Sequence, residues 1–242
     1  MKLKIIVPCT AKELVEPTEK EANKYSSNDT KIDVESLDQG TKTIESSVDN
    51  DLCAPDVLRI VEQSISAEYD GIIIESMTDT ALESAREIAD IPVVGPGRTS
   101  MLFAADLANS FSIITVLENL VRLEENLAKL AGMSEKLVSV RHIGIPVLGH
   151  QENEEVVKLL REESIKAIEK DGAQAIILGC GALMGIEEKL SEALLKRGYN
   201  IPLIYPLPVT IKYIETLVSL RLTHSKKCYP TPKKEIKITD SQ

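Results

Sequence analysis

Two similar stretches of the chain each place one small polar residue at the point where an apolar run ends. Residues 70–79 (DGIIIESMTD) contain Ser76, and residues 173–182 (AQAIILGCGA) contain Cys180. An apolar run rich in β-branched residues is typical of a buried parallel strand, and a helical pattern follows each run. We therefore expect Ser76 and Cys180 at strand ends, beside helix N-termini. Two such positions facing each other would hold a substrate carbon between an oxygen and a sulfur atom.

The remaining cysteines do not form a metal-binding pattern. Cys9, Cys53, Cys180 and Cys228 include no Cys-x-x-Cys pair, and the three histidines are scattered. Structural zinc sites use closely spaced pairs of such ligands. The sequence therefore indicates no metal site, and unpaired thiols favour a reducing cytoplasm.

Strands and helices alternate along most of the chain. The apolar patterns predict strands at 3–7, 31–34, 71–75, 91–94, 111–116, 136–140, 143–147, 175–178 and 201–205. Helical patterns lie between them, at 11–24, 55–67, 80–89, 101–108, 117–131, 153–170, 186–197 and 209–222. The polar segment 35–51 is expected to be a loop, and the glycine-rich segment 95–100 a turn.

This alternation indicates an α/β fold of parallel sheets with right-handed crossovers. An Ile-Pro strand follows each of the two similar units, at Ile91 and Ile201, which suggests an internal duplication. We expect two pseudo-symmetric lobes, each a mainly parallel sheet flanked by helices, with the active site in the cleft between them. The expected boundaries are 1–98 plus 206–222 for the first lobe, 99–205 for the second, and 223–242 for a C-terminal tail.

Composition excludes several classes of partner. The net charge of the 242 residues is −10, and the chain has no Trp and two Phe. An acidic chain with so few aromatic residues is a poor candidate for binding nucleic acid. No segment approaches the roughly 18 apolar residues of a membrane span, and the apolar run at the N-terminus is too short for a signal peptide. We expect a cytoplasmic protein with a small-molecule substrate.

Several segments, in order, resemble the Asp/Glu/hydantoin racemase superfamily, most closely its hydantoin and allantoin racemase branch. Residues 178–181 (LGCG) look like the second cysteine motif of that branch, and residues 70–79 look like the first, where Ser76 falls on the usual cysteine. The resemblance covers nearly everything up to about Leu222. Further segments that match are 81–82, 86–87, 92–97, 111–115 and 140–148.

The resemblance implies a cofactor-independent proton transfer at a carbon next to a carbonyl or carboxylate. In the family two cysteines on opposite faces of that carbon act as base and acid. A free thiol has a pKa of roughly 8.5, which a helix N-terminus lowers, so a thiolate can take the proton and the opposite thiol can return one. Backbone N–H groups at the helix N-termini would stabilise the enolate-like charge. Relatives commonly assemble, so a homo-oligomer is expected.

Ser76 departs from this pattern. A hydroxyl is a far weaker acid than a thiol. It is not a base at neutral pH unless a neighbouring base activates it. Glu75 adjoins it, but neighbours on a strand point to opposite faces. The chain is then a racemase or epimerase in which Cys180 works with another partner, such as Cys9 or a water, or an enzyme similar to arylmalonate decarboxylases with Cys180 as the single proton donor. It could also be a non-catalytic small-acid-binding homologue, or carry Ser76 as a deliberate replacement made to trap a ligand.

Arg98 is a second departure, because the branch commonly has an acidic residue there. A guanidinium can pair with a substrate carboxylate, which would favour an anionic acid over a neutral hydantoin ring. The alternative is that Arg98 faces solvent or pairs with an acid such as Asp106. The other residues expected to contact substrate are Cys9, Thr10, Thr78, Thr99, Ser100, Thr115 and Gly181. Hydroxyl residues at helix starts are also common N-caps.

Two candidate features have simpler interpretations. A lone cysteine such as Cys180 is commonly a small buried hydrophobic residue, but its place in a Leu-Gly-Cys-Gly turn favours a functional thiol. The acidic helix around residues 118–130 is expected to present a solvated or subunit-contacting face.

Overall fold

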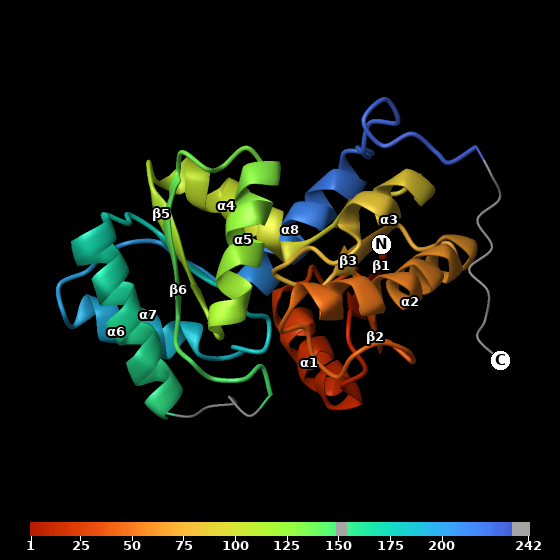
Figure 1. The fold of residues 1–242 in the computed structure, drawn as a ribbon. Helices are drawn as coiled ribbons and strands as arrows, with labels where there is room; N and C mark the ends of the chain where they lie inside the picture. Colours follow the sequence, from red (N-terminus) through yellow and green to blue (C-terminus); the bar gives the residue numbers. More distant parts are fainter. Residues whose placement is uncertain (149–153, 234–242) are drawn as a thin grey trace. The chain divides into compact units, whose positions relative to one another are not determined.

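The computed structural model describes residues 1–148 and 154–233 (Figure 1). The chain divides into two compact units. The first comprises residues 1–75, 79–95 and those from 210 onward, and the second comprises residues 76–78 and 96–209. The expected helix start at 153 and the end of the expected tail, 234–242, lie outside the described residues.

The first unit is built on a parallel sheet of four strands in the order β2-β1-β3-β4. The strands are β1 (Lys2–Val7), β2 (Lys31–Ser36), β3 (Gly71–Ile74) and β4 (Val93–Val94). Its helices are α1 (Val15–Tyr25), preceded by a 3-10 turn (Lys12–Leu14), α2 (Ser47–Ser66), α3 (Leu82–Ile88) and most of α8 (Pro206–Ser219). Isoleucines of β1 and β3 pack against the apolar face of α2, including Val57 and Ile60, so burial of both sheet faces explains the unbroken apolar runs.

The second unit repeats this plan with a parallel sheet in the order β6-β5-β7-β8. The strands are β5 (Phe111–Thr115), β6 (Leu137–His142), β7 (Ile176–Leu178) and β8 (Leu203–Ile204). The helices are α4 (Pro96–Leu107), α5 (Glu118–Leu130), α6 (Glu154–Asp171) and α7 (Glu187–Leu195), of which α6 and α7 lie side by side (Figure 1). Two four-stranded parallel sheets flanked by helices confirm the predicted α/β fold with two lobes.

The two sheets have the same strand order, and their registers are equivalent. In the first, Ile6 pairs with Ile74, and the next amide along β3 donates to the carbonyl of Ile6 at 2.8 Å. In the second, Ile114 pairs with Leu178, and the next amide along β7 donates to the carbonyl of Ile114 at 2.9 Å. The residues that follow these amides are Ser76 and Cys180, which therefore occupy corresponding strand ends.

Three helices begin earlier than the sequence predicted. Helix α2 begins at Ser47, inside the segment expected to be a loop, because the Ser46 hydroxyl accepts a hydrogen bond from the Asp49 amide at 3.2 Å and caps the helix. Helix α4 begins at Pro96 within the expected turn, since proline suits the first helical position. Helix α8 begins at Pro206 rather than at residue 209.

The strand expected at 143–147 is wrong. The amides of Ile143 and Ile145 donate to the carbonyls of Thr115 and Val116 at 3.1 and 3.0 Å, so the chain continues beside the end of β5. Gly144 has φ +74°, however, and this left-handed residue breaks the extended conformation that a strand needs. Strand β6 accordingly ends at His142.

The described part of the tail is held against α3 and β4. The amide of Val93 donates to Nε2 of His224 at 3.0 Å, and Arg86 Nη1 donates to the hydroxyl of Tyr229 at 3.1 Å. The ammonium group of Lys226 donates to three carbonyl oxygens near the C-terminal end of α3, those of Arg86, Glu87 and Ala89. These bonds fix the segment from His224 to Tyr229 on the first unit.

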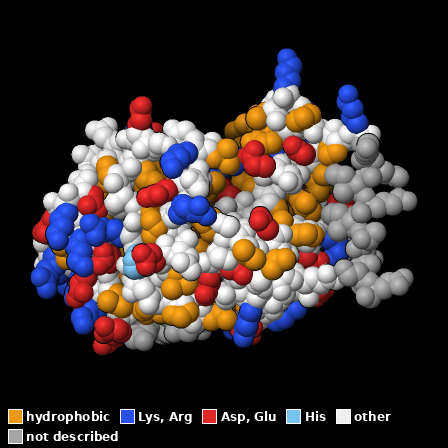
Figure 2. All heavy atoms as spheres, viewed as in Figure 1, with side chains coloured by type: hydrophobic (Ala, Val, Ile, Leu, Met, Phe, Trp, Pro, Cys, Tyr) orange, Lys and Arg blue, Asp and Glu red, His pale blue; other side chains and the backbone are white. Residues whose placement is uncertain are grey.

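The molecular face in Figure 2 mixes side chains of every kind. Acidic side chains lie among the lysines and arginines, and apolar side chains are interspersed with both. Within the described part of the chain, no helix has the length and apolar character needed to cross a membrane.

Candidate functional site

Ser76 lies in a short turn that belongs to the second unit, although only Glu75 separates it from β3 of the first. Its hydroxyl oxygen is 2.8 Å from that of Thr78 and accepts a hydrogen bond from the Thr78 amide at 3.3 Å. Met77, between them, is buried in a core cluster that also contains Met101 and Phe111. Ser76 is 9% exposed. The turn thus belongs to the same compact unit as Cys180.

Cys180 follows Gly179 at the end of β7 and is a free, buried thiol with 7% exposure. The turn closes where the amide of Leu183 donates to the carbonyl of Cys180 at 3.2 Å. A Cβ atom on Gly179 would lie 2.8 Å from the Cα atom of Thr115, so only glycine allows β7 to approach β5 this closely. Gly181 is half-buried in the same turn. Backbone packing therefore fixes the position of the thiol.

Thr115 is fully buried, and its hydroxyl is engaged inside the second unit. Its Oγ1 lies 2.8 Å from Oε1 of Glu124 and 3.2 Å from the carbonyl oxygen of Gly179, within hydrogen-bond distance of both. Burial raises the pKa of Glu124 to about 8, against the opposing effect of the Thr115 hydrogen bond. This buried carboxyl was not expected, because the acidic helix was predicted to present a solvated or subunit-contacting face. The available signal was helical spacing: Glu124 lies four residues after Leu120 and three before Leu127, which puts it on the buried apolar face of α5.

Glu75, which directly follows β3, carries a second buried carboxyl group. Both of its carboxylate oxygens are inaccessible to solvent, and neither has a hydrogen-bond partner among the described residues. Burial, and then the charge of Asp79, raise the pKa of Glu75 to about 7. A carboxyl that titrates near neutrality therefore precedes Ser76 directly.

Three of the predicted binding residues share the first turns of α4, which packs against β7. Thr99 and Ser100 are buried and Arg98 is half-buried. The hydroxyl oxygen of Ser100 has no hydrogen-bond partner in the part of the chain that the structure describes. The N-terminal end of a helix favours negative charge. The start of α4 therefore combines a guanidinium, a helix N-terminus and a buried hydroxyl.

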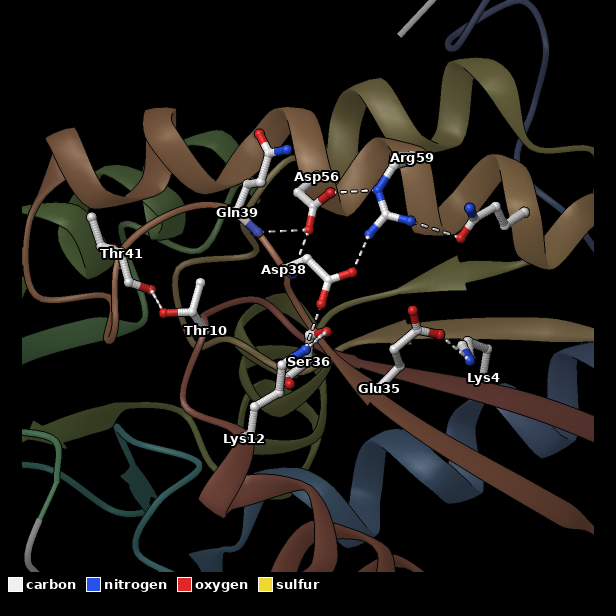
Figure 3. Close-up of polar contacts among 11 residues, drawn as sticks. Lys4, Thr10, Lys12, Glu35, Ser36, Asp38, Gln39, Thr41, Asp56 and Arg59 are labelled. Atoms are coloured by element: carbon white, nitrogen blue, oxygen red, sulfur yellow. Dashed lines mark hydrogen bonds and ion pairs between the residues drawn. The ribbon is translucent and has the colours of Figure 1, made fainter. Parts of the chain in front are cut away.

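Cys9 and Thr10 lie in the first unit, after β1. The amide and hydroxyl of Thr10 both donate to the carbonyl of Thr41, at 2.9 and 3.2 Å (Figure 3). Burial raises the pKa of the Cys9 thiol above its usual value, which keeps it protonated near pH 7. Cys9 is therefore better suited to donate a proton than to accept one.

The loop after β2 is braced by Asp56 of α2. Its carboxylate accepts hydrogen bonds from the amides of Asp38 and Gln39 at 2.8 and 3.2 Å and from the guanidinium of Arg59 (Figure 3). These bonds lower the pKa of Asp56, although burial opposes them. The brace holds the chain that leads to Thr41, and so the position of Thr10.

The predicted site residues therefore fall into two groups. The second unit holds Ser76, Thr78, Arg98, Thr99, Ser100, Thr115, Cys180 and Gly181, and the first holds Cys9 and Thr10. Across residues 1–148 and 154–233, no three His, Cys, Asp or Glu side chains are grouped as a metal site would require.

Known proteins resemble the chain over almost its whole length. The hydantoin racemase of Pseudomonas sp. (strain NS671) is 32% identical, over 97% of this chain and 93% of its own. The structure of allantoin racemase from Klebsiella pneumoniae superposes with a TM-score of 0.89 at 28% identity, covering 97% of this chain and 95% of that one. The crystal structure of arylmalonate decarboxylase shares the fold, with a TM-score of 0.60 at 16% identity and coverage of 90% and 92%.

The family model described as Asp/Glu/hydantoin racemase matches residues 3–214. This match takes in both strand ends, Ser76 and Cys180, and all the helices that pack on the two sheets except the end of α8. The resemblance that the motifs indicated is confirmed: the chain belongs to the Asp/Glu/hydantoin racemase family.

Proposed function

We propose that this protein is a racemase or epimerase that moves a proton at a carbon next to a carbonyl or carboxylate, with Cys180 as the principal proton carrier. The observation that carries the proposal is the equivalence of two strand ends in a duplicated sheet, one with Ser76 and the other with Cys180. A thiol can exchange protons near neutral pH, whereas a serine hydroxyl needs help to do so. The reaction needs no cofactor in this scheme.

Removal of the proton leaves negative charge on the adjacent oxygen, as in an enolate. The start of α4, with Arg98 and the hydroxyl of Ser100, offers positive charge and a hydrogen-bond donor for an anionic substrate group. We therefore propose a carboxylic acid or a hydantoin-like compound as substrate. Four free thiols support a reducing, cytoplasmic setting, and a homo-oligomeric assembly is part of the same proposal.

One observation favours a second candidate, a decarboxylase of the arylmalonate type. Only one of the two equivalent strand ends carries a thiol, so Cys180 could protonate a carbanion on one face after CO₂ leaves. Such an enzyme needs one acid and no symmetrical base.

Deuterium exchange followed by NMR separates the two candidates. Hydantoins, allantoin, amino acids and arylmalonates are incubated in D₂O with the protein and with the variants Ser76→Cys and Cys180→Ala. Cys228→Ser is the matched control, because Cys228 is an exposed thiol in the tail. A racemase exchanges deuterium into a chiral centre and inverts it without releasing CO₂, and Cys180→Ala abolishes this while Cys228→Ser does not.

The Ser76→Cys variant measures how much the serine lowers the rate of exchange. If it is faster than the natural chain, two-thiol chemistry has been restored on an intact site. CO₂ release from arylmalonates by the natural chain, without exchange into any other compound, would instead establish the decarboxylase. Exchange that survives in Cys180→Ala would exclude both mechanisms.

A further inference from the structure

Three buried groups in the second unit form a line that ends at the peptide bond of Cys180. Glu124 lies on α5, Thr115 ends β5, and Gly179 directly follows β7. The distance from Thr115 Oγ1 to Glu124 Oε1 is 2.8 Å, and that from Thr115 Oγ1 to the carbonyl oxygen of Gly179 is 3.2 Å. The Gly179 carbonyl belongs to the peptide group that bears the Cys180 amide. Whatever holds this carbonyl therefore holds the start of the Cys180 turn.

The number of protons shared by these three groups indicates whether Glu124 is ionised or neutral. The hydroxyl of Thr115 has one proton and two acceptors beside it. If Glu124 is ionised, the hydroxyl donates to the carboxylate and the Gly179 carbonyl receives no bond from it. If Glu124 is a neutral acid, its own proton goes to Thr115 Oγ1, and the Thr115 hydroxyl then donates to Gly179. Only the neutral acid satisfies both contacts.

The surroundings of Glu124 favour the neutral acid. Its side chain has no solvent exposure, and Oε2 has no partner among the described residues. A buried carboxylate without a cation is costly. Helix α5 packs against α4, β5 and β6, whose titratable residues are Arg98, Asp106, Arg141 and His142. None of these shifts the pKa of Glu124, which burial and Thr115 determine, and Arg141 is paired with Asp171 at 2.6 Å.

We propose that Glu124, as a neutral carboxylic acid, is a positioning residue that holds the Gly179–Cys180 peptide through the hydroxyl of Thr115. Glu124 touches no reacting atom and orients the thiol of Cys180. The proposal rests on the proposed function only for the effect of Glu124 on turnover. Gly179 lets the two strands approach closely enough for this contact. We call the contacts from Glu124 through Thr115 to Gly179 the relay. Packing alone does not depend on pH, whereas the relay is broken when Glu124 ionises.

The test compares Glu124→Gln, Glu124→Leu and Thr115→Val, with Glu125→Gln as the control on the exposed face of the same helix. An amide at 124 donates to Thr115 at every pH, whereas leucine and the Thr115→Val change break the relay. Deuterium uptake by the backbone of residues 179–183 reports on the turn without any substrate. Turnover is measured in parallel on a compound that the natural protein exchanges.

At pH 6.5 we expect Glu124→Gln and Glu125→Gln to match the natural protein in both readouts. Glu124→Leu and Thr115→Val should lose protection in residues 179–183 by at least about fivefold and lower kcat about 10- to 100-fold, with KM little changed. Above about pH 8 the natural protein should lose protection relative to Glu124→Gln. Ionised Glu124 then accepts the hydrogen bond of the Thr115 hydroxyl, which no longer donates to Gly179. If Glu124→Leu does not fold, the proposal is still tested by Thr115→Val and by the comparison of the natural protein with Glu124→Gln above pH 8.

Two results would overturn the proposal. One is unchanged protection of residues 179–183 in Thr115→Val. The other is a Glu124→Gln protein as impaired as Glu124→Leu at pH 6.5, which would mean that the ionised carboxylate is the working form. If no compound is turned over, the racemase proposal fails, but the deuterium-uptake comparison still tests the relay.

Discussion

The hydroxyl of Thr30 donates to the carboxylate of Glu215 at 2.7 Å, although the two residues are 185 positions apart in the chain. The same carboxylate accepts bonds from the amide and hydroxyl of Ser27 at 2.7 and 2.9 Å and from Lys212 at 2.9 Å. Glu215 lies in α8, so these bonds tie the last helix of the first unit to the turn before β2. One buried carboxylate thus joins two segments of the first unit that lie far apart in the sequence.

Loss of this carboxylate should destabilise the first unit. Burial raises the pKa of Glu215, but the bonds from Ser27, Lys212 and Thr30 outweigh it and leave the pKa below its usual value. Its contribution to stability is therefore present above the unfolded pKa, near 4.3, and is lost as pH falls through the folded pKa. We expect Glu215→Gln to lose about 1–3 kcal/mol at pH 7, and the difference to shrink below about pH 4.

Urea unfolding at pH 7 and at pH 3.5 checks this prediction. The control is Glu192→Gln, which removes an exposed ion pair with Lys196 and should cost under about 0.5 kcal/mol. Equal stability of Glu215→Gln and the natural protein at pH 7 would contradict it.

Glu75 should have the opposite effect on stability. Its pKa is about 7 in the folded protein because of burial and the charge of Asp79, so the folded state keeps a proton that the unfolded state releases. The stability it contributes is complete below pH 4.5 and is lost as pH rises through 7. Glu75→Gln cannot ionise, so it should be more stable than the natural protein above pH 7, by about 3 kcal/mol.

Thermal unfolding between pH 4.5 and 8.5 measures the Glu75 effect. Glu19→Gln, on the exposed side of α1, serves as the control and should follow the natural protein at each pH. A constant difference between Glu75→Gln and the natural protein across this range would show that Glu75 does not titrate there.

Gly179→Ala should be more harmful than Gly71→Ala. At Gly179 a Cβ would lie 2.8 Å from the Cα of Thr115, which is backbone, whereas at Gly71 it would lie 2.8 Å from the flexible end of Ile214. We expect Gly179→Ala to lose about 1–3 kcal/mol and Gly71→Ala less. Urea midpoints compare them, and equal costs would mean that β5 and β7 can separate easily.

Arg98→Gln should discriminate between charged and neutral substrates. If the guanidinium holds a carboxylate, its loss should raise KM for an acid by about tenfold or more and leave KM for an uncharged hydantoin unchanged. Arg122→Gln, on the exposed face of α5, is the control for a general change in charge. Parallel losses on both substrates would assign Arg98 a structural role.

The sequence patterns predicted the sheets well because buried parallel strands are short, continuous apolar runs. The first turns of α2 were not predictable from apolar spacing, because Val48 and Leu52 are 64% and 57% exposed there. Only the Ser46–Asp49 cap marks that helix start. Glu75 and Glu124 were missed for a related reason: burial of an acid depends on how distant elements pack, which local pattern does not report.

The tail contacts protect the first sheet from a hazard common to parallel sheets. Strand β4 is an edge strand, and the outward amides of such a strand can pair with another chain unless something covers them. His224 accepts the hydrogen bond of the Val93 amide, and Lys226 covers the carbonyls at the end of α3. The C-terminal segment thus occupies the edge where intermolecular strand addition would begin, so its removal should make the protein more prone to aggregation.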